Sequence, residues 1–203
     1  MDNGPDGASH HALEDIAWTR VLPNLKGFNP IDINDLKGAI IRALEIDGPV
    51  YIRTARDIVP KVYPEEVGYM DGTADLLEND GDDLLLIFEG TAAKQAYDGF
   101  DVLREKGYKC KLMNIRSIKP VDKESIVREA KAVKGIITVE NHTVNAGLGG
   151  IVSEIIAEEG IGIPLRRIGV QDQFTESGKT EDVKIKYGLC GNEILKAVEK
   201  LKL

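Results

Sequence analysis

Two neighbouring histidines, His10 and His11, stand close to the start of the chain in the stretch "NGPDGASHHALEDIAWTR", residues 3–20. Gly, Pro, Asp and Ser precede the pair and an apolar helical pattern follows it, which predicts a loop that leads into a helix. Such a loop offers free N–H groups to an oxyanion, and a histidine there can donate to a substrate oxygen or move a proton near pH 7. By local pattern alone, a polar turn with a helix cap is the more frequent explanation of Asp6, Ser9 and their neighbours.

Arg53 and Arg56 form a second candidate site, at the end of the predicted strand 50–56. Ligands of α/β proteins usually bind beyond the carboxyl ends of parallel strands, and a guanidinium group matches a phosphate with two parallel hydrogen bonds. Surface ion pairs are the competing interpretation, and the residues alone favour that one.

A third polar cluster lies in "VENHTVNAGLGGIVSEI", residues 139–155, where a strand pattern ends in Glu140, Asn141 and His142. The glycines that follow loosely imitate a dinucleotide-binding turn. The turn is too long and too polar for that, and no acidic strand end follows at the required distance. We therefore expect these glycines to allow close packing of a helix on a strand: Gly147, Gly149 and Gly150.

The composition narrows the class of partner. The chain is 42% hydrophobic and 30% charged, which is ordinary for a globular protein, and its net charge of -8 argues against nucleic acid and against an anionic membrane surface. No apolar run approaches the ~20 residues of a membrane span. Cys110 and Cys190 form neither a metal pattern nor a disulfide framework, so we expect no metal site, reduced thiols and a cytoplasmic location.

The first part of the chain reads as half of a doubly wound α/β unit. We expect a helix over 13–22, an extended piece at 25–30, a helix over 33–46 capped by Asp32, and the strand 50–56. Residues 1–56 are therefore expected to form an incomplete half-domain. Two prolines and weak periodicity indicate a linker over 57–71.

The second part, residues 72–203, is expected to form a complete small three-layer α/β domain with a mixed sheet. Asp80-Gly81 is a hairpin signal, so an edge strand at 73–78 should pair antiparallel with a central strand at 84–88. Alternating elements then predict parallel pairing with crossover helices. The expected strands are 109–115, 135–140 and 165–170, and the expected helices are 91–106 (capped by Thr91), 122–134 (capped by Asp122), 149–159, 180–187 and 191–202.

Several stretches resemble transketolases, in the order that family has them. They are "GPDGASHHALEDIAWTRVLPNL", "FNPIDINDLKGAI", "GPVYIRTARD", "LLLIFEGT", "SIKPVD", "TVENHTVNAGLGGIVSEI" and "RIGVQDQFTESG" with a later "KYGL". The resemblance covers essentially the whole chain. It implies that His10 is a catalytic residue that faces the substrate beside thiamine diphosphate. It also implies that Asp6 binds a hydroxyl of the donor sugar and that Arg56 holds the sugar phosphate. His11 stands where many relatives have Gln, so no role transfers to it.

The chain also departs from the family pattern. It lacks the Gly-Asp-Gly…Asn motif that holds the metal and diphosphate, and it lacks the first half of the pyrimidine-binding domain with its activating glutamate. The resemblance therefore implies a transketolase C-terminal section: part of the pyrimidine-binding domain (1–56) and the C-terminal domain (72–203). We expect it to need a transketolase N-terminal section as partner, to form a homodimer through the C-terminal domain and to act on sugar phosphates. Thiamine diphosphate and Mg²⁺ would belong to the complete enzyme, and the chain alone should bind neither and be inactive.

Other interpretations stay open on the sequence. A 1-deoxyxylulose-5-phosphate synthase and the β chain of a 2-oxoacid dehydrogenase share the C-terminal domain. The stretch "DQFTESGKTEDVKIKYGL" fits transketolases and the synthase better than the dehydrogenase. A non-catalytic dimerisation or interaction module is a third possibility, because the second domain is expected to be intact beside a partial first one.

Overall fold

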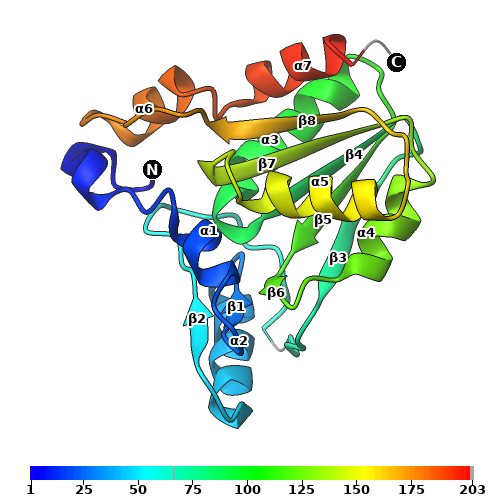
Figure 1. Ribbon diagram of the computed structural model, residues 1–203. Helices are drawn as coiled ribbons and strands as arrows, with labels where there is room; N and C mark the ends of the chain where they lie inside the picture. The colour runs from blue at the N-terminus through cyan, green and yellow to red at the C-terminus, as the bar shows by residue number, and fades with distance from the viewer. Residues whose placement is uncertain (66, 202–203) are drawn as a thin grey trace.

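A five-stranded mixed sheet forms the centre of the molecule (Figure 1). The computed structural model describes residues 1–65 and 67–201. The strands are β3 (Ala74–Asn79), β4 (Leu84–Glu89), β5 (Cys110–Ile115), β7 (Gly135–Thr143) and β8 (Leu165–Val170), in the order β3-β5-β4-β7-β8. All neighbouring strands are parallel except β3, which runs antiparallel to β5 at one edge. The expected α/β class, with a mixed sheet and one antiparallel edge strand, is confirmed.

The predicted hairpin between β3 and β4 is wrong. β3 pairs with β5, and β4 lies between β5 and β7. The turn at 79–83 crosses the start of β5 on its way from β3 to β4. Asp80 N donates to Cys110 O at 2.9 Å, and Asp83 N donates to Lys109 O at 2.9 Å. A buried apolar strand such as β4 gains more from two parallel neighbours than from the edge strand nearest in sequence.

Helices cover both faces of this sheet, which makes the three layers. Helices α3 (Ala93–Glu105) and α7 (Gly191–Glu199) pack on one face, and α4 (Lys123–Ala130) and α5 (Leu148–Glu158) pack on the other (Figure 1). Every residue of β4 is buried between them. A short helix, α6 (Thr180–Lys186), follows β8. The helix expected over 191–202 ends at Glu199, and its residue 202 lies outside the described residues.

Two of the three predicted helix caps are confirmed. Asp32 accepts from the backbone N–H groups of Asn34 and Asp35, and Asp122 accepts from that of Ser125. The third is wrong: Thr91 lies inside a 3-10 turn, η3 (Gly90–Ala92), and its own N–H donates to Glu89 at 3.0 Å. Glu89, at the end of β4, is therefore the residue whose side chain caps η3.

A second, smaller sheet carries the first part of the chain (Figure 1). Strands β1 (Lys26–Phe28) and β2 (Val50–Ile52) are parallel, and the helix between them, α2 (Ile33–Glu45), makes the crossover, as in a doubly wound unit. A third strand that the sequence did not reveal, β6 (Ser117–Lys119), pairs antiparallel with β1. The helix expected over 13–22 is the short α1 (Asp15–Arg20), and β2 ends before Arg53.

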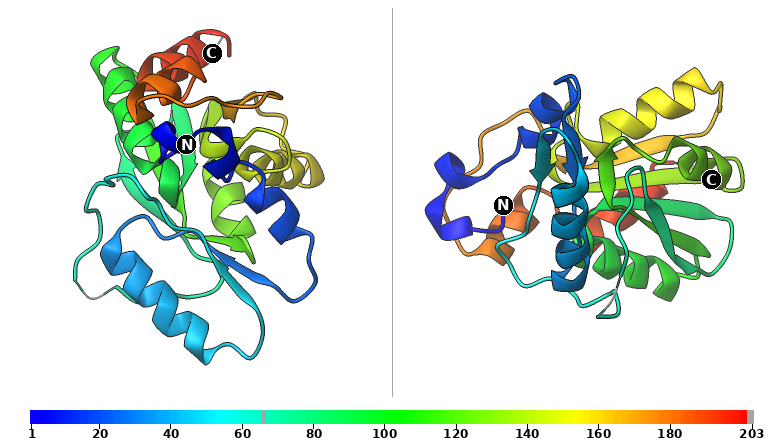
Figure 2. Two further views of the ribbon diagram at one scale, coloured as in Figure 1. Left: turned by 90° about the vertical axis from the view of Figure 1, so that its left-hand side faces the viewer. Right: turned by 90° about the horizontal axis from the view of Figure 1, so that it is seen from below.

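The first part of the chain packs closely on the rest. Met1 and Leu13 are buried with Val170, Val183 and Leu189, which come from β8 and the segment after it. Figure 2 shows the small sheet and α2 standing beside the end of the large sheet. The segment 57–71 contains no helix or strand in its described residues, yet Tyr63 and Tyr69 are buried, with the Arg116 guanidinium 4.9 Å and 4.6 Å from their ring centroids. In the part of the chain that the structure covers, no helix is both long and apolar enough to span a bilayer.

Candidate active site

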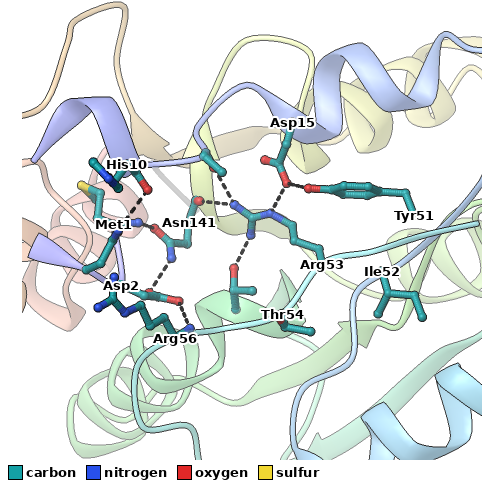
Figure 3. Close-up of a pocket in the computed structure, with 13 residues that line it drawn as sticks. Met1, Asp2, His10, Asp15, Tyr51, Ile52, Arg53, Thr54, Arg56 and Asn141 are labelled. Atoms are coloured by element: carbon teal, nitrogen blue, oxygen red, sulfur yellow. Dashed lines mark hydrogen bonds and ion pairs between the residues drawn. The ribbon is translucent and has the colours of Figure 1, made fainter. Parts of the chain in front are cut away.

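A polar cleft of about 290 Å³ opens where the N-terminal turns meet the carboxyl ends of strands from both sheets (Figure 3). Arg53 and Arg56 follow β2, Thr91 follows β4, and Asn141 lies near the end of β7. His10 reaches the same cleft from the N-terminal turn η2 (Ala8–His10). The chain thus gathers polar groups at the edge where α/β proteins usually bind ligands.

The side chain of His10 is exposed to solvent. Its Nδ1 lies 3.0 Å from Ser9 Oγ, and its backbone carbonyl accepts from Asn3 Nδ2 at 3.1 Å. The expected loop that leads into a helix is present, but α1 begins at Asp15, five residues after His10, and has only six residues. Any role of His10 must therefore come from its imidazole and not from a helix dipole.

Asp6 and Arg56, which sequence reasoning assigned to substrate binding, form an ion pair with 2.5 Å between Oδ2 and Nη1. The hydrogen bond from Arg56 holds the pKa of Asp6 below its usual range. Both side chains are exposed, with 37% and 69% of their surface accessible. Arg56 lines the cleft beside His10, whereas Asp6 meets it only through Arg56. An exposed pair of this kind is weak and can open for a ligand.

His11 is buried, unlike its neighbour. Its Nδ1 lies 2.6 Å from Thr175 Oγ1, and its Nε2 lies 3.4 Å from the carbonyl of Asn3. Burial lowers its pKa, which favours the neutral ring. His11 therefore ties the N-terminal segment to the loop after β8 and does not face the cleft.

Arg53 behaves differently from Arg56, although the sequence presented them as a pair. Its side chain is 7% exposed, and its guanidinium bonds to Asp15 Oδ2 at 2.7 Å, to both carboxylate oxygens of Glu89 at 3.2 Å, and to Thr91. Two carbonyls, of Ala12 and Asn141, take the remaining N–H groups at 2.9 Å and 2.8 Å. Burial opposes its charge, but Glu89 and Asp15 raise its pKa above the usual value. Arg53 is therefore neither part of a surface ion pair nor available to bind a ligand, the two roles that the sequence suggested for it.

Two titratable residues of β7, Glu140 and His142, are fully buried, and they lie near Asp15 of α1, which lines the cleft. Burial raises the pKa of Glu140 to about 8 and lowers that of His142. His142 Nε2 and Asp15 Oδ1 are 3.9 Å apart, and neither has a hydrogen-bond partner in the described part of the chain. These groups sit in the wall between the two sheets.

Two of the three glycines after β7, Gly147 and Gly149, pack as closely as predicted, whereas a Cβ atom on Gly150 would meet only Arg20 Nη1, at 3.6 Å. A Cβ atom on Gly147 would lie 2.1 Å from Glu140 Oε2, and one on Gly149 would lie 2.6 Å from Arg167. Gly149 N also donates to Glu140 Oε1 at 3.1 Å. The turn therefore seats the start of α5 directly on buried side chains, and a dinucleotide has no place there.

The described residues contain no cluster of three or more His, Cys, Asp or Glu side chains that could hold a metal ion. Of the two arginines that line the cleft, Arg53 has its N–H groups bonded to Asp15, Glu89, Thr91 and two backbone carbonyls, which leaves a single arginine for an anion. The donor set of this part of the chain therefore does not fit a Mg²⁺-diphosphate group, and we derive no step through one.

Comparison with known families defines the class to which this fold and cleft belong. Residues 72–201 match the family model described as the transketolase C-terminal domain, and residues 1–61 match the one described as the transketolase pyrimidine binding domain. The chain therefore belongs to the transketolase family, as its motifs indicated.

Individual relatives agree with this assignment. A protein of Methanocaldococcus jannaschii, provisionally named a transketolase C-terminal section, is 38% identical over 98% of this chain and 63% of its own length. A 1-deoxy-D-xylulose-5-phosphate synthase of Desulfitobacterium hafniense is 36% identical over 98% of this chain, but over only 32% of its own length. A solved structure of a split gene transketolase, described as an inactive beta4 tetramer, has a TM-score of 0.88 and 35% identity over 96% of this chain and 63% of that chain. This chain thus spans between 32% and 63% of the length of these three proteins.

Proposed function

We propose that this chain is the C-terminal section of a thiamine diphosphate-dependent transketolase, which moves a two-carbon ketol unit from a ketose phosphate to an aldose phosphate. The observation that carries the proposal is the cleft that presents His10 and Arg56 together, in a chain whose two parts match the pyrimidine-binding and C-terminal domains. The likeness to a split gene transketolase supports a division of the enzyme into two sections.

In this proposal the exposed residues of the cleft handle the sugar. His10 donates a hydrogen bond or a proton to a substrate oxygen, because its side chain is exposed and lines the cleft. The phosphate of the sugar displaces Asp6 from Arg56 and takes two parallel N–H bonds. Asp6, released from the pair, then accepts a hydrogen bond from a sugar hydroxyl.

The cofactor belongs to the complete assembly. We propose that the N-terminal section supplies the groups that hold Mg²⁺ and the diphosphate, and that this chain alone binds neither and is inactive. We further propose that residues 1–56 belong to the pyrimidine-binding domain, that 57–71 link it to a C-terminal domain over 72–203, and that this second domain forms a homodimer in the cytoplasm.

A 1-deoxyxylulose-5-phosphate synthase is the second candidate, because such an enzyme is 36% identical to this chain. The two reactions differ in their products. The synthase is named for its product, 1-deoxy-D-xylulose 5-phosphate, whereas a transketolase moves a two-carbon ketol unit from a ketose phosphate to an aldose phosphate.

The test is to assay the purified chain, alone and mixed with a transketolase N-terminal section from a related two-chain enzyme, with thiamine diphosphate and Mg²⁺ present. We expect no turnover from the chain alone and ketol transfer from the mixture. Formation of 1-deoxy-D-xylulose 5-phosphate would favour the synthase. Turnover by the chain alone would contradict the proposed division.

A further inference from the structure

His142 on β7 has one ring nitrogen bonded and the other facing a carboxylate. Its Nδ1 lies 2.6 Å from the carbonyl oxygen of Thr143. A carbonyl only accepts a hydrogen bond, so Nδ1 carries the hydrogen, and Nε2 of the neutral ring is left with a lone pair. That lone pair faces Asp15 Oδ1 at 3.9 Å, and both atoms lack a hydrogen-bond partner in the part of the chain that the structure describes. Two buried acceptors therefore face each other.

The carboxylate of Asp15 uses its other oxygen toward the cleft. Oδ2 accepts from Tyr51 OH and from Arg53 Nε, each at 2.7 Å (Figure 3). Asp15, Tyr51 and Arg53 all line the cleft. The carboxylate thus lies between His142 and two residues of the cleft, so a change at His142 reaches the cleft through one side chain.

One cation serves two buried carboxylates beside His142. Arg53 bonds to Asp15 at 2.7 Å and to Glu89 at 3.2 Å, and all three side chains are at most 7% exposed. Burial lowers the pKa of His142, with a smaller contribution from Arg53, so its ring is neutral at pH 7. The two carboxylates oppose this effect and let the ring take a proton in acid solution.

Glu140 of the same strand faces the other ring nitrogen. Its Oε2 lies 3.8 Å from His142 Nδ1, and its Oε1 accepts from Gly149 N at 3.1 Å. Burial raises the pKa of Glu140 to about 8, although the charge of Arg167 on β8 opposes this. The carboxyl is therefore protonated in neutral and acid solution. The two neighbours of His142 thus differ, with a neutral carboxyl beside Nδ1 and the carboxylate bound to Arg53 beside Nε2.

A proton on His142 must move Asp15. When Nε2 takes a proton from solvent, its new N–H donates to Asp15 Oδ1, and no other bond of the ring breaks. A charged N–H···O bond is about 2.7–2.9 Å long, so the two atoms approach by about 1 Å. The ring is held in place, because Nδ1 is bonded to Thr143 and a Cβ atom on Gly147 would lie 2.5 Å from it. Asp15 lies on the six-residue α1, so the carboxylate moves and its Oδ2 leaves the two residues of the cleft.

We propose that His142 is a proton-controlled positioning residue for the cleft: when neutral it leaves Asp15 bonded to Arg53, and when protonated it draws the Asp15 carboxylate away. Protonation then frees Arg53 Nε and shifts the backbone that carries Arg56 into the cleft. Acid solution therefore weakens the binding of a phosphorylated ligand. This last step rests on the proposed function, which assigns the cleft to sugar phosphates, whereas the movement of Asp15 does not.

The test is an NMR titration of the 203-residue chain, labelled with ¹⁵N, from alkaline to mildly acid pH. The chain has three histidines, so the rings of His10, His11 and His142 can be told apart by replacing each in turn. At alkaline pH His142 should carry its hydrogen on Nδ1. As the pH falls, Nε2 should take a proton at a midpoint below 6.5, and the Nε–H signal of Arg53 should move with the same midpoint.

Two matched variants separate the proposal from an effect of burial alone. Asp15 and Glu140 place carboxyl oxygens 3.9 Å and 3.8 Å from the two ring nitrogens of His142. Asp15→Asn should lower the pKa of His142 by about 1 or more, as expected for loss of an opposite charge within ~4–6 Å. Glu140→Gln should change that pKa little, because the carboxyl is already uncharged where His142 titrates.

Three results would overturn the inference: a His142 ring that stays neutral until the chain unfolds, an Arg53 signal that does not follow it, or equal effects of Asp15→Asn and Glu140→Gln. If Asp15→Asn does not fold, His142→Asn decides the question, because its amide takes no proton and the Arg53 signal should lose its pH step. A step that persists would contradict the proposal. These readouts need no activity, so a confirmed step in a chain that never supports ketol transfer would refute the proposed function alone.

Discussion

Arg53, just after a strand of the small sheet, and Glu89, at the end of a strand of the large sheet, meet as a buried ion pair, with Arg53 Nη1 3.2 Å from both oxygens of Glu89. Arg53 follows β2 of the small sheet, and Glu89 ends β4 of the large one. Asp15 of α1 binds the same guanidinium at 2.7 Å. One side chain therefore joins three elements at the back of the cleft, and it orients the backbone from which Arg56 reaches the ligand space.

Replacement of Arg53 should damage stability far more than replacement of Arg56. Arg53→Gln leaves Asp15 and Glu89 buried without a counter-charge, and removal of one partner of a buried pair costs about 3–5 kcal/mol. Arg56→Gln removes an exposed pair and should cost less than about 1 kcal/mol. Urea unfolding followed by circular dichroism measures both free energies. Equal losses would contradict the structural role given to Arg53.

Glu140 should make the chain less stable as pH rises. Its pKa lies near 8 in the folded chain because of burial, against 4.5 as the reference value. Between these values the unfolded chain gives up the proton that the folded chain keeps, so the free energy of unfolding falls from about pH 4.5 to about pH 8. Glu140→Gln should therefore stabilise the chain at pH 8 and have little effect below pH 4.5.

The measurement is the difference in unfolding free energy between Glu140→Gln and the unaltered chain, taken at several pH values. Glu105→Gln is the control, because Glu105 is exposed at the end of α3. A flat profile for Glu140→Gln would show that the buried carboxyl is ionised at neutral pH.

Gly147→Ala should destabilise the fold through a clash alone. Gly147 has a φ of -82°, which any residue adopts, but its Cβ would lie 2.1 Å from Glu140 Oε2 and 2.5 Å from His142 Nδ1. Overpacking of this kind costs about 1–3 kcal/mol. Gly162→Ala, with no atom within 4 Å of its Cβ, should change the melting temperature little. If the two variants melted together, the packing around Glu140 would be looser than the structure shows.

Arg56→Ala should act on substrate binding more than on turnover. A phosphate is held equally in the ground state and the transition state, so its loss raises KM and changes kcat little. A charged hydrogen bond contributes roughly 1.5–3 kcal/mol, which corresponds to about 10- to 100-fold in KM. Steady-state kinetics of the complemented enzyme tests this, and a donor without phosphate serves as the control because its KM should not change. A fall in kcat at constant KM would place Arg56 elsewhere in the reaction.

Most of the large sheet could be predicted from the sequence because its signals are local. The buried run 84–88, the Asp122 cap and the crossover helices each follow from neighbouring residues, and each appears in the structure. The pairing of β3 with β5 could not be predicted, because a turn signal such as Asp80-Gly81 does not show whether the two strands that flank the turn pair with each other. The three residues of β6 carry too short a pattern to reveal a strand, and only the pairing with β1 defines it.

The candidate site was harder to predict, because its wall consists of residues that meet only in the fold. Asp15 and Glu89 lie far from Arg53 in sequence, and nothing local marked them as its partners. A signal for Glu89 was present, since a carboxylate that ends a fully apolar strand must find a buried counter-charge. The different surroundings of His10 and His11 also depend on distant contacts, above all the one between His11 and Thr175.

The most direct test of the account compares the two histidines in the complemented enzyme. His10→Ala should lower kcat by roughly 10²- to 10⁴-fold, as expected for loss of proton transfer or oxyanion stabilisation, and should leave the circular dichroism spectrum and the melting temperature unchanged. His11→Ala should lower the melting temperature, because its ring is buried against Thr175, and should leave most of kcat at temperatures where the variant is folded. A near-normal kcat for His10→Ala beside a strong loss for a folded His11→Ala would contradict the assignment of His10 as the catalytic residue of the cleft.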